Sequence, residues 1–430
     1  MLLRSFFGGC LIGAAALSAL PSRAGLSAQL MRQRHHELLE RAGADPARAP
    51  VPRGMPDHVA VQLGERPAGA PALVDEALNS GARLQFVQTL IHRETHPLGL
   101  GLRLGAVAYD EPARAKLAGS ELSLPLGPGE AYVSYESRHW GPGWFGSLIL
   151  DGAAPPLAAA GWRIAGDPSA TWQADLFAGT LRGHSVPAGP RLIGMRLEWR
   201  PSRAWTLALA RTMQWGGDGR NENLGTFAHA LLGRDNTNDA SLGPGNEPGN
   251  QLAGVDVRYD LALADSAELG AYVQLIGEDN TGSGVPSRRM QLLGIDAGTV
   301  LGALSLRAIV EFADTTAGKA PGVAYRHPLY PAGYTHRGQL LGHQVGGDAR
   351  LASAGLLLDR GPAFAMLALH RGRAQTASQR FVAGDALAGA DVSLMFDAHE
   401  RLRLGVSAHR WRAGSNTARW AQAWAQYSWP

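Results

Sequence analysis

Residues 252–263 read L-A-G-V-D-V-R-Y-D-L-A-L, so apolar and polar side chains alternate along most of this stretch. Successive side chains of a β-strand point to opposite faces of the sheet. One face of this strand would be apolar, and the other would carry the charges of Asp256, Arg258 and Asp260. Because this pattern recurs behind an N-terminal secretory signal, it predicts a transmembrane barrel that is apolar towards lipid and polar towards its lumen.

The same period of two recurs along the chain from about residue 81. Strands of about ten residues suit a bilayer that is crossed at a tilt. Clear examples are residues 131–136, 170–176, 193–200, 269–275, 304–312 and 402–409. The sequence therefore predicts an all-β fold, a transmembrane antiparallel β-barrel. Counting such segments gives roughly 16–18 strands, and an even number is expected for a bacterial barrel.

Residues 1–24 have the features of a secretory signal peptide. Arg4 precedes an apolar run, and Ser22-Arg23-Ala24 offers small residues at the first and last positions of a cleavage site. An N-terminal membrane anchor is the alternative, but the apolar run is short for a spanning helix. The only cysteine of the chain, Cys10, lies in this segment, so no disulfide is expected after cleavage.

Residues 25–80 differ in character from the strand-rich part of the chain, residues 81–430. An amphipathic helix is expected over residues 26–42, and five prolines between residues 46 and 67 interrupt the stretch after that helix. We interpret residues 25–80 as a small helical and irregular periplasmic segment that packs near or under the barrel.

The net charge of the chain is only +3 at pH 7. Such a small excess gives no basic surface for a nucleic acid, and none is expected as a partner. Outer-membrane lipid is the partner that the strand pattern itself implies.

A series of motifs rich in glycine, aromatic and charged residues continues along the chain in a fixed order. They are Arg138-His139-Trp140-Gly141-Pro142-Gly143, Gly146-Ser147-Leu148-Ile149-Leu150, Gln214-Trp215-Gly216-Gly217-Asp218-Gly219-Arg220, Gly233-Arg234-Asp235-Asn236, Asn250-Gln251-Leu252-Ala253-Gly254, Gly277-Glu278-Asp279, Tyr325-Arg326-His327, Tyr330, Gly333-Tyr334, Leu341-Gly342-His343 and Gly347-Asp348. Together they resemble the signature of the Wzi family of capsule-assembly proteins.

This resemblance implies an outer-membrane β-barrel with a helical periplasmic element. It also implies a lectin rather than an enzyme, one that helps to retain capsular or other extracellular polysaccharide at the cell surface. A contact with the polysaccharide-export machinery is a further expectation.

The residues in these motifs suit a sugar, which needs flat apolar faces and bidentate polar groups. The candidate binding residues are Arg138, Trp140, Trp144, Trp215, Asp218, Arg220, Asp235, Asn236, Tyr330 and Tyr334. For Trp140 and Trp215, sugar contact and packing in the lumen both remain open. Trp172 and Trp199 are expected in the aromatic girdle of the barrel, and the charges of the inner face are expected to form an ion-pair lattice.

Two other functions remain as alternatives. A passive channel for small hydrophilic solutes would need the same polar lumen. An enzyme is not expected, because the sequence has neither G-x-S-x-G nor H-E-x-x-H. No cofactor or metal is expected either, since the oxygen ligands spaced as in a calcium loop, Asp235, Thr237 and Asp239, lack the glycine and glutamate of such a loop.

Overall fold

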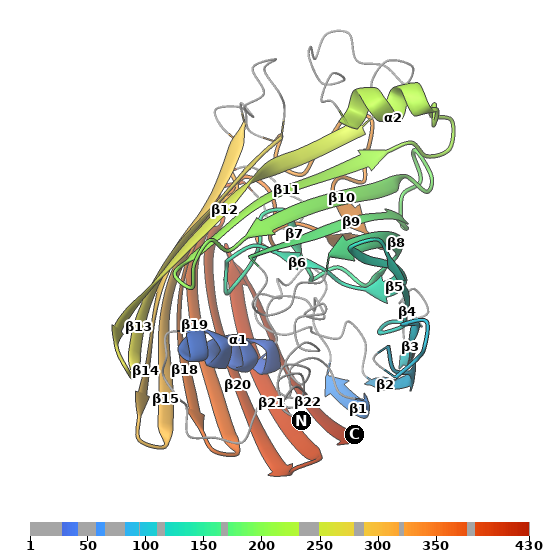
Figure 1. Cartoon of the computed structure of the whole chain (residues 1–430). Helices are drawn as coiled ribbons and strands as arrows, with labels where there is room; N and C mark the ends of the chain where they lie inside the picture. Colours follow the sequence, from blue (N-terminus) through green and yellow to red (C-terminus); the bar gives the residue numbers. More distant parts are fainter. Residues whose placement is uncertain are drawn as a thin grey trace.

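In a computed structural model, the chain forms a barrel of 18 antiparallel strands, which confirms the predicted fold (Figure 1). The structure describes residues 28–41, 57–64, 82–93, 95–109, 117–164, 171–231, 249–278, 288–317, 322–375 and 383–429. The expected signal peptide, residues 1–24, lies outside these residues.

The strands of the wall follow the order of the chain. They are β1 (Asp57–Gly64), β2 (Ala82–Ile91), β3 (Gly101–Tyr109), β4 (Glu121–Leu126), β5 (Gly129–Glu136), β8 (Leu157–Ile164), β9 (Trp172–Thr180), β10 (Arg191–Trp199), β11 (Trp205–Trp215), β12 (Gly249–Ala264), β13 (Ala267–Gly277), β14 (Arg289–Leu301), β15 (Leu304–Asp314), β18 (Ala349–Arg360), β19 (Ala363–Ala374), β20 (Ala386–His399), β21 (Leu402–Ala413) and β22 (Asn416–Trp429). The elements outside the wall are α1 (Ala28–Arg41), α2 (Leu224–Leu231), β6 (His139–Trp140), β7 (Leu150–Asp151), β16 (Thr335–His336) and β17 (Gln339–Leu340).

The first and last strands of the wall close the ring. Val61 of β1 stands opposite Leu84 of β2 and opposite Ala425 of β22. A barrel must pair every strand on both sides, because unpaired backbone groups are costly in lipid. β1 lies within the stretch that the sequence assigned to a periplasmic segment, so the barrel begins at residue 57 and not at residue 81.

The wall is apolar outside and charged inside, as residues 252–263 predicted. In β12, Val255 is 38% exposed, whereas its neighbour Asp256 is 4% exposed. Asp256 pairs with Arg196 of β10, and Arg258 pairs with Asp296 of β14 at 2.7 Å. These ion pairs support the predicted lattice, since a buried charge is tolerated only when it is compensated.

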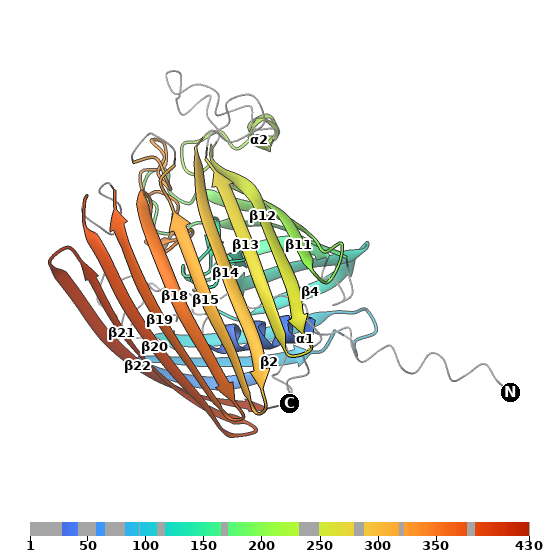
Figure 2. The same ribbon diagram turned by 90° about the vertical axis from the view of Figure 1, so that its left-hand side faces the viewer.

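The two ends of the barrel differ in the length of their connections (Figure 2). Two residues join β12 to β13, β14 to β15, β18 to β19 and β20 to β21 at one end. At the other end, β11 and β12 are connected through α2, and residues 315–348 connect β15 to β18. Short turns are periplasmic and long loops extracellular in barrels of the outer membrane.

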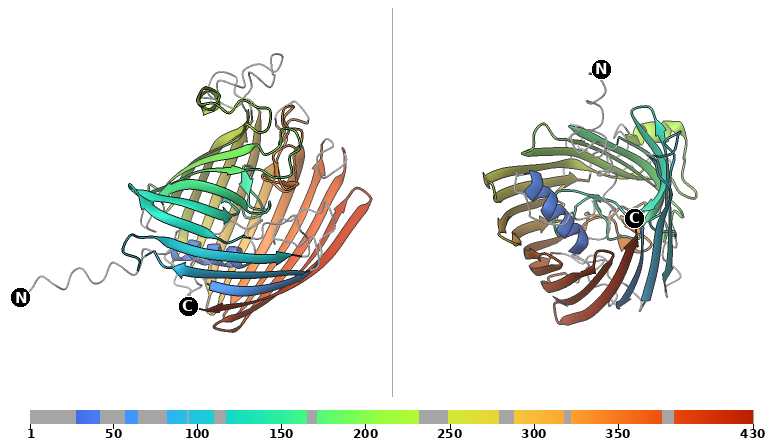
Figure 3. Two further views of the ribbon diagram at one scale, coloured as in Figure 1. Left: turned by 90° about the vertical axis from the view of Figure 1, so that its right-hand side faces the viewer. Right: turned by 60° about the horizontal axis from the view of Figure 1, so that its bottom comes forward.

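The helix α1 confirms the predicted helix over residues 26–42, but it lies inside the ring of strands and not beneath it (Figure 3). Arg32 donates to Asp359 at 2.8 Å and to Asp397 at 2.7 Å, and His36 Nε2 lies 2.6 Å from Asp359 Oδ2. The sequence pattern suggested one polar, solvated side. That side instead binds carboxylates of the inner wall, so both sides of the helix are buried.

No helix within the described ranges is long and apolar enough to span a membrane.

Candidate functional site

Two loops turn back into the lumen from the extracellular end of the wall. The first luminal loop, residues 137–156, contains β6 and β7, and the second, described at residues 315–317 and 322–348, contains β16 and β17. Asp151 N donates to Leu341 O at 2.7 Å and joins the two loops. Their apolar side chains form one continuous core with residues of α1 and of the inner wall.

Trp144 lies at the centre of this core and is completely buried. Its indole nitrogen donates to Asp296 at 3.0 Å, and its backbone nitrogen donates to Glu311 at 2.7 Å. The guanidinium carbons of Arg34 and Arg307 lie 4.4 Å and 5.3 Å from its ring centroid. Such cation–π contacts stabilise the ring within the protein and leave none of it for a ligand.

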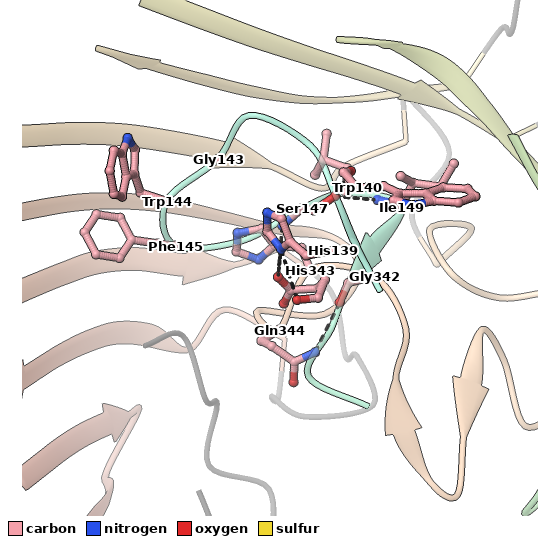
Figure 4. Close-up of polar contacts among 12 residues, drawn as sticks. His139, Trp140, Gly143, Trp144, Phe145, Ser147, Ile149, Gly342, His343 and Gln344 are labelled. Atoms are coloured by element: carbon pink, nitrogen blue, oxygen red, sulfur yellow. Dashed lines mark hydrogen bonds and ion pairs between the residues drawn. The ribbon is translucent and has the colours of Figure 1, made fainter. Parts of the chain in front are cut away.

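Hydrogen bonds hold the first luminal loop to itself and to the wall; Figure 4 shows residues of this loop beside His343 of the second loop. Ser147 Oγ donates to the carbonyl of Trp140, which also accepts from Gln274 Nε2 at 2.8 Å. Ser147 N donates to Asp151 at 3.0 Å. The Trp140 ring meets Phe177 edge to face at 5.5 Å, so Trp140 packs in the lumen, one of the two roles that the sequence left open.

Two tyrosines fix the second luminal loop. The Tyr325 hydroxyl donates to Leu148 O at 2.8 Å and accepts from His343 N at 3.1 Å. Tyr334 donates to Thr212 of the wall at 2.7 Å. Both tyrosines are buried, so the second loop is anchored to the first loop and to β11.

Buried histidines lie where the luminal loops meet. Burial, with His370 and His139 nearby, lowers the pKa of His343 to about 3. Burial also lowers the pKa of His139 to about 4. Both imidazoles are therefore neutral at pH 7, which suits groups that are removed from water.

The helix α1 holds the first luminal loop from the periplasmic side. Arg34 donates to the carbonyls of Pro142 and, at 2.7 Å, of Gly143. His35 accepts from Arg307 at 2.9 Å. Helix, loops and wall thus form one packed body through the lumen.

Three segments meet at the extracellular end and form a surface that we call the rim: residues 181–190, 215–223 and 322–340. Arg337 N donates to Arg182 O at 2.7 Å, and Asp218 N donates to Ala188 O at 2.9 Å. Arg220 donates to Leu329 O at 2.7 Å. These contacts hold the segments together, and a stiff polar surface results.

Polar side chains remain exposed on the rim. They include those of Arg182, Asp218, Asn221 and Arg326. Guanidinium groups offer bidentate donors, and carboxylate and amide groups offer acceptors to sugar hydroxyls. The rim therefore has the chemistry expected of a surface that binds a hydrated polymer.

Eight of the ten candidate residues from the sequence fall into three groups. Trp140, Trp144, Tyr330 and Tyr334 are buried, and the side-chain polar atoms of Trp144, Tyr330 and Tyr334 bind protein. Asp218 is exposed and Arg220 is half-buried at the rim. Asp235 and Asn236 lie outside the described residues, as does the oxygen-ligand pattern of residues 235–239.

Arg138 and Trp215 take other positions. Arg138, at the start of the first luminal loop, contacts the inner wall: it lies 3.6 Å from Asp175, and its guanidinium lies over the ring of Phe177 at 4.1 Å. Trp215 lies at the extracellular end of β11 and meets Phe227 of α2 at 5.7 Å. It shares the outward side of β11 with Leu209 and Met213, since these positions are even steps apart.

Trp172 and Trp199 stand opposite each other on β9 and β10 and are both about half exposed. That position on the outer wall is the one predicted for girdle residues.

The sequence analysis did not single out Arg182 or Arg326 for the rim. Arg326 lies in the motif 325–327, so the family resemblance pointed to this segment. Within it, however, only Arg326 is exposed, whereas Tyr325 and His327 are buried. Arg182 lies in no motif. Only the docking of its loop against residues 335–337 brings it to the rim.

One line of groups on the inner wall has the composition of a catalytic triad. Ser353 Oγ lies 2.8 Å from His370 Nδ1, and His370 Nε2 lies 2.9 Å from Asp391. His409 binds the other oxygen of Asp391 at 2.8 Å and Ser407 at 3.0 Å. All five side chains are buried, so the line is a symmetric wall network without access for a substrate.

Within the described ranges, no cluster of three or more histidine, aspartate or glutamate side chains could hold a metal ion.

Comparisons with known proteins agree with the motif pattern. A family model described as capsule assembly protein Wzi matches residues 110–418. An uncharacterized 55.8 kDa protein in the cps region of Klebsiella pneumoniae is 33% identical over 185 residues, which are 41% of this chain and 36% of that protein. The chain thus matches little more than a third of the length of this relative.

Two solved structures share the barrel. One is the Escherichia coli protein Wzi, described as an outer membrane protein involved in group 1 capsule assembly and as a carbohydrate-binding β-barrel. It has a TM-score of 0.72 at 21% identity, over 94% of this chain and 89% of that chain. Pseudomonas aeruginosa OpdQ has a TM-score of 0.51 at 9% identity, over 87% of this chain and 98% of that chain. At these identities the likeness concerns the fold alone.

Proposed function

Because this outer-membrane β-barrel belongs to the Wzi family of capsule assembly proteins, we propose that its rim binds a surface polysaccharide and helps to attach it to the cell. The observation that carries this proposal is the contrast between lumen and rim. Protein side chains occupy the lumen from α1 to the second luminal loop, whereas Arg182, Asp218, Asn221 and Arg326 are exposed at the rim.

The binding is non-covalent and weak at each repeat unit. A polymer presents the same unit many times, so repeated contacts raise its effective concentration at the cell surface. The packed lumen serves this role because it fixes the rim loops before the polymer arrives, and preorganised groups lose less entropy on binding.

A passive channel is less well supported. Trp144 is completely buried at the centre of the lumen, and both luminal loops are bonded to the wall on several sides. We expect no steady open conductance from the purified protein in a planar bilayer. A stable conductance in that experiment would favour the channel.

The proposed role requires no catalysis, and the family is not one of enzymes. The buried line through Asp391 has no approach for a glycan. Release of reducing ends from the host's own polysaccharide by purified protein would overturn this part of the proposal.

A contact with the polysaccharide-export machinery stays a prediction. Cross-linking in living cells, followed by identification of the proteins attached to this chain, would test it.

The decisive experiment deletes the gene in its host and measures polysaccharide bound to cells and shed into the medium. We expect unchanged synthesis with a larger shed fraction, and restored retention when the intact gene is returned. Unchanged retention after deletion would overturn the proposal.

A further inference from the structure

The outer wall carries an apolar groove near the periplasmic end of β18 to β22. Its volume is about 660 Å³, which lies in the range of sites that hold ligands of drug size. Its lining includes Leu358, Arg360, Ala363, Ala365, Leu394 and Phe396.

Strand register explains why the wall is hollow here. Ala365 of β19 stands between Leu358 of β18 and Leu394 of β20. One step nearer the periplasm, Ala363 stands between Arg360 and Phe396. Small side chains on the middle strand thus form a floor between larger side chains on both neighbours, and all of them point outward.

The groove lies between Leu367 of β19 and the periplasmic end of the wall. The next outward residue of β19 after Ala365 is Leu367, which is 42% exposed and fills the level above the floor. At the other end β18 and β19 are joined by the two-residue turn 361–362. The groove therefore extends from the periplasmic end of the wall towards the middle of the membrane.

Arg360 provides a positive charge at the periplasmic end of the groove. Its side chain points outward and is exposed, whereas its neighbour Asp359 points inward and binds Arg32 of α1. The residues that line the groove include no carboxylate. An anionic group at the mouth would complement this charge.

Aromatic side chains mark this level as the interface between lipid and water. Phe86 and Trp429 lie 5.7 Å apart on neighbouring parts of the outer wall, and Tyr427 lies 6.5 Å from Trp429. Such residues gather at the interface in transmembrane barrels. The mouth of the groove thus lies at the depth of lipid headgroups and its floor at the depth of acyl chains.

We propose that this groove is a binding site for one phospholipid of the periplasmic leaflet. An acyl chain lies over Ala363 and Ala365, and the phosphate accepts hydrogen bonds from the Arg360 guanidinium. The site is separate from the rim and goes beyond the proposed polysaccharide binding.

Native mass spectrometry of the intact protein, released from mild detergent, tests the proposal. We expect one retained phospholipid on the unaltered protein and its loss in Ala365→Leu, which fills the floor. The matched control is Ala354→Leu, which adds the same atoms to the outward side of β18 beyond the groove and keeps the lipid. Equal retention in the two variants would overturn the proposal.

The charge is tested by titrating delipidated protein with dioleoylphosphatidylglycerol. We expect Arg360→Gln to weaken binding about tenfold, as for loss of a charge-assisted hydrogen bond. The control Arg371→Gln, at the extracellular end of β19, should bind as the unaltered protein does. Unchanged affinity of Arg360→Gln would exclude its phosphate contact and overturn the proposal.

The same spectra distinguish other occupants. A dimer that Ala365→Leu dissociates would assign the groove to a second copy of the chain, and retained lipopolysaccharide would assign it to the outer leaflet. Either result contradicts the proposal. Polysaccharide retention should be unchanged in Ala365→Leu and Arg360→Gln, so failure of this site and failure of the proposed function are separate outcomes.

Discussion

Trp144, directly after the motif 138–143, and Trp215, within the motif 214–220, both lie beside glycine, yet they have different surroundings in the structure. Trp144, in the first luminal loop, is completely buried and donates to Asp296. Trp215, at the rim, is half-buried, and its indole nitrogen has no hydrogen-bond partner in the part of the chain that the structure describes.

The difference shows what each region requires. Most polar side chains of the luminal loops are paired with protein groups, because an unpaired buried group is costly. The rim keeps polar groups exposed, as the proposed binding of a hydrated polymer requires. Motif residues in the lumen therefore hold the protein together, and exposed ones at the rim can meet a ligand.

The largest expected effect is on stability, from Trp144→Ala. Removing a buried tryptophan leaves a cavity and should lower the free energy of unfolding by about 3–5 kcal/mol. Urea unfolding in phospholipid bilayers measures this change. Trp199→Ala, on the outer wall, is the control. An equal loss in both variants would contradict the contrast between a packed lumen and a lipid-facing wall.

Acid should weaken the packing of the luminal loops. His343 is neutral in the folded protein because burial lowers its pKa to about 3, while the unfolded chain binds its proton near pH 6.5. The contribution of His343 is thus complete above pH 6.5 and falls by about 1.4 kcal/mol for each pH unit below it, until about pH 3.

The free energy of unfolding, measured at several pH values between pH 7 and pH 4.5, tests this expectation. His343→Gln should flatten the pH dependence by the stated slope, whereas His92→Gln, at an exposed periplasmic turn, should leave it unchanged. A slope that His343→Gln does not alter would exclude this histidine as a cause.

The rim should respond through binding and not through stability. Asp218→Ala removes an exposed acceptor, so affinity for the host's own polysaccharide should fall about threefold to tenfold, as for the loss of one hydrogen bond. Stability should change by less than about 0.5 kcal/mol, as is usual for surface positions. The control Glu400→Ala changes an exposed carboxylate at the periplasmic end. Equal binding by both variants would remove Asp218 from the site.

The smallest effect is expected from Trp215→Leu. The contact with Phe227 contributes about 0.5–1.5 kcal/mol, and its loss should loosen α2 while binding changes by less than about twofold, or about 0.4 kcal/mol. Polysaccharide binding and protease sensitivity of residues 224–231 are the two measurements. A large loss of polysaccharide binding would indicate that Trp215 contacts the ligand directly.

The barrel could be predicted from the sequence, because a strand that crosses a membrane between lipid and a polar lumen alternates apolar and polar side chains. Asp256 and Arg258 could be assigned to the lumen on that ground alone. The helix within residues 26–42 was also readable, since its apolar residues recur at helical spacing. The family motifs indicated the function but not which motif residue faces a ligand.

Which residues are buried could not be predicted from the sequence, because burial depends on contacts between distant parts of the chain. The burial of Trp144 depends on Asp296, Glu311 and Arg34, which lie far from it in the sequence. The position of α1 in the lumen depends on its ion pair with Asp359, and the place of β1 in the wall depends on β22. The periodicity of the sequence distinguishes the two faces of a single strand or helix. It does not show which distant residues will pack against a face or compensate its charges.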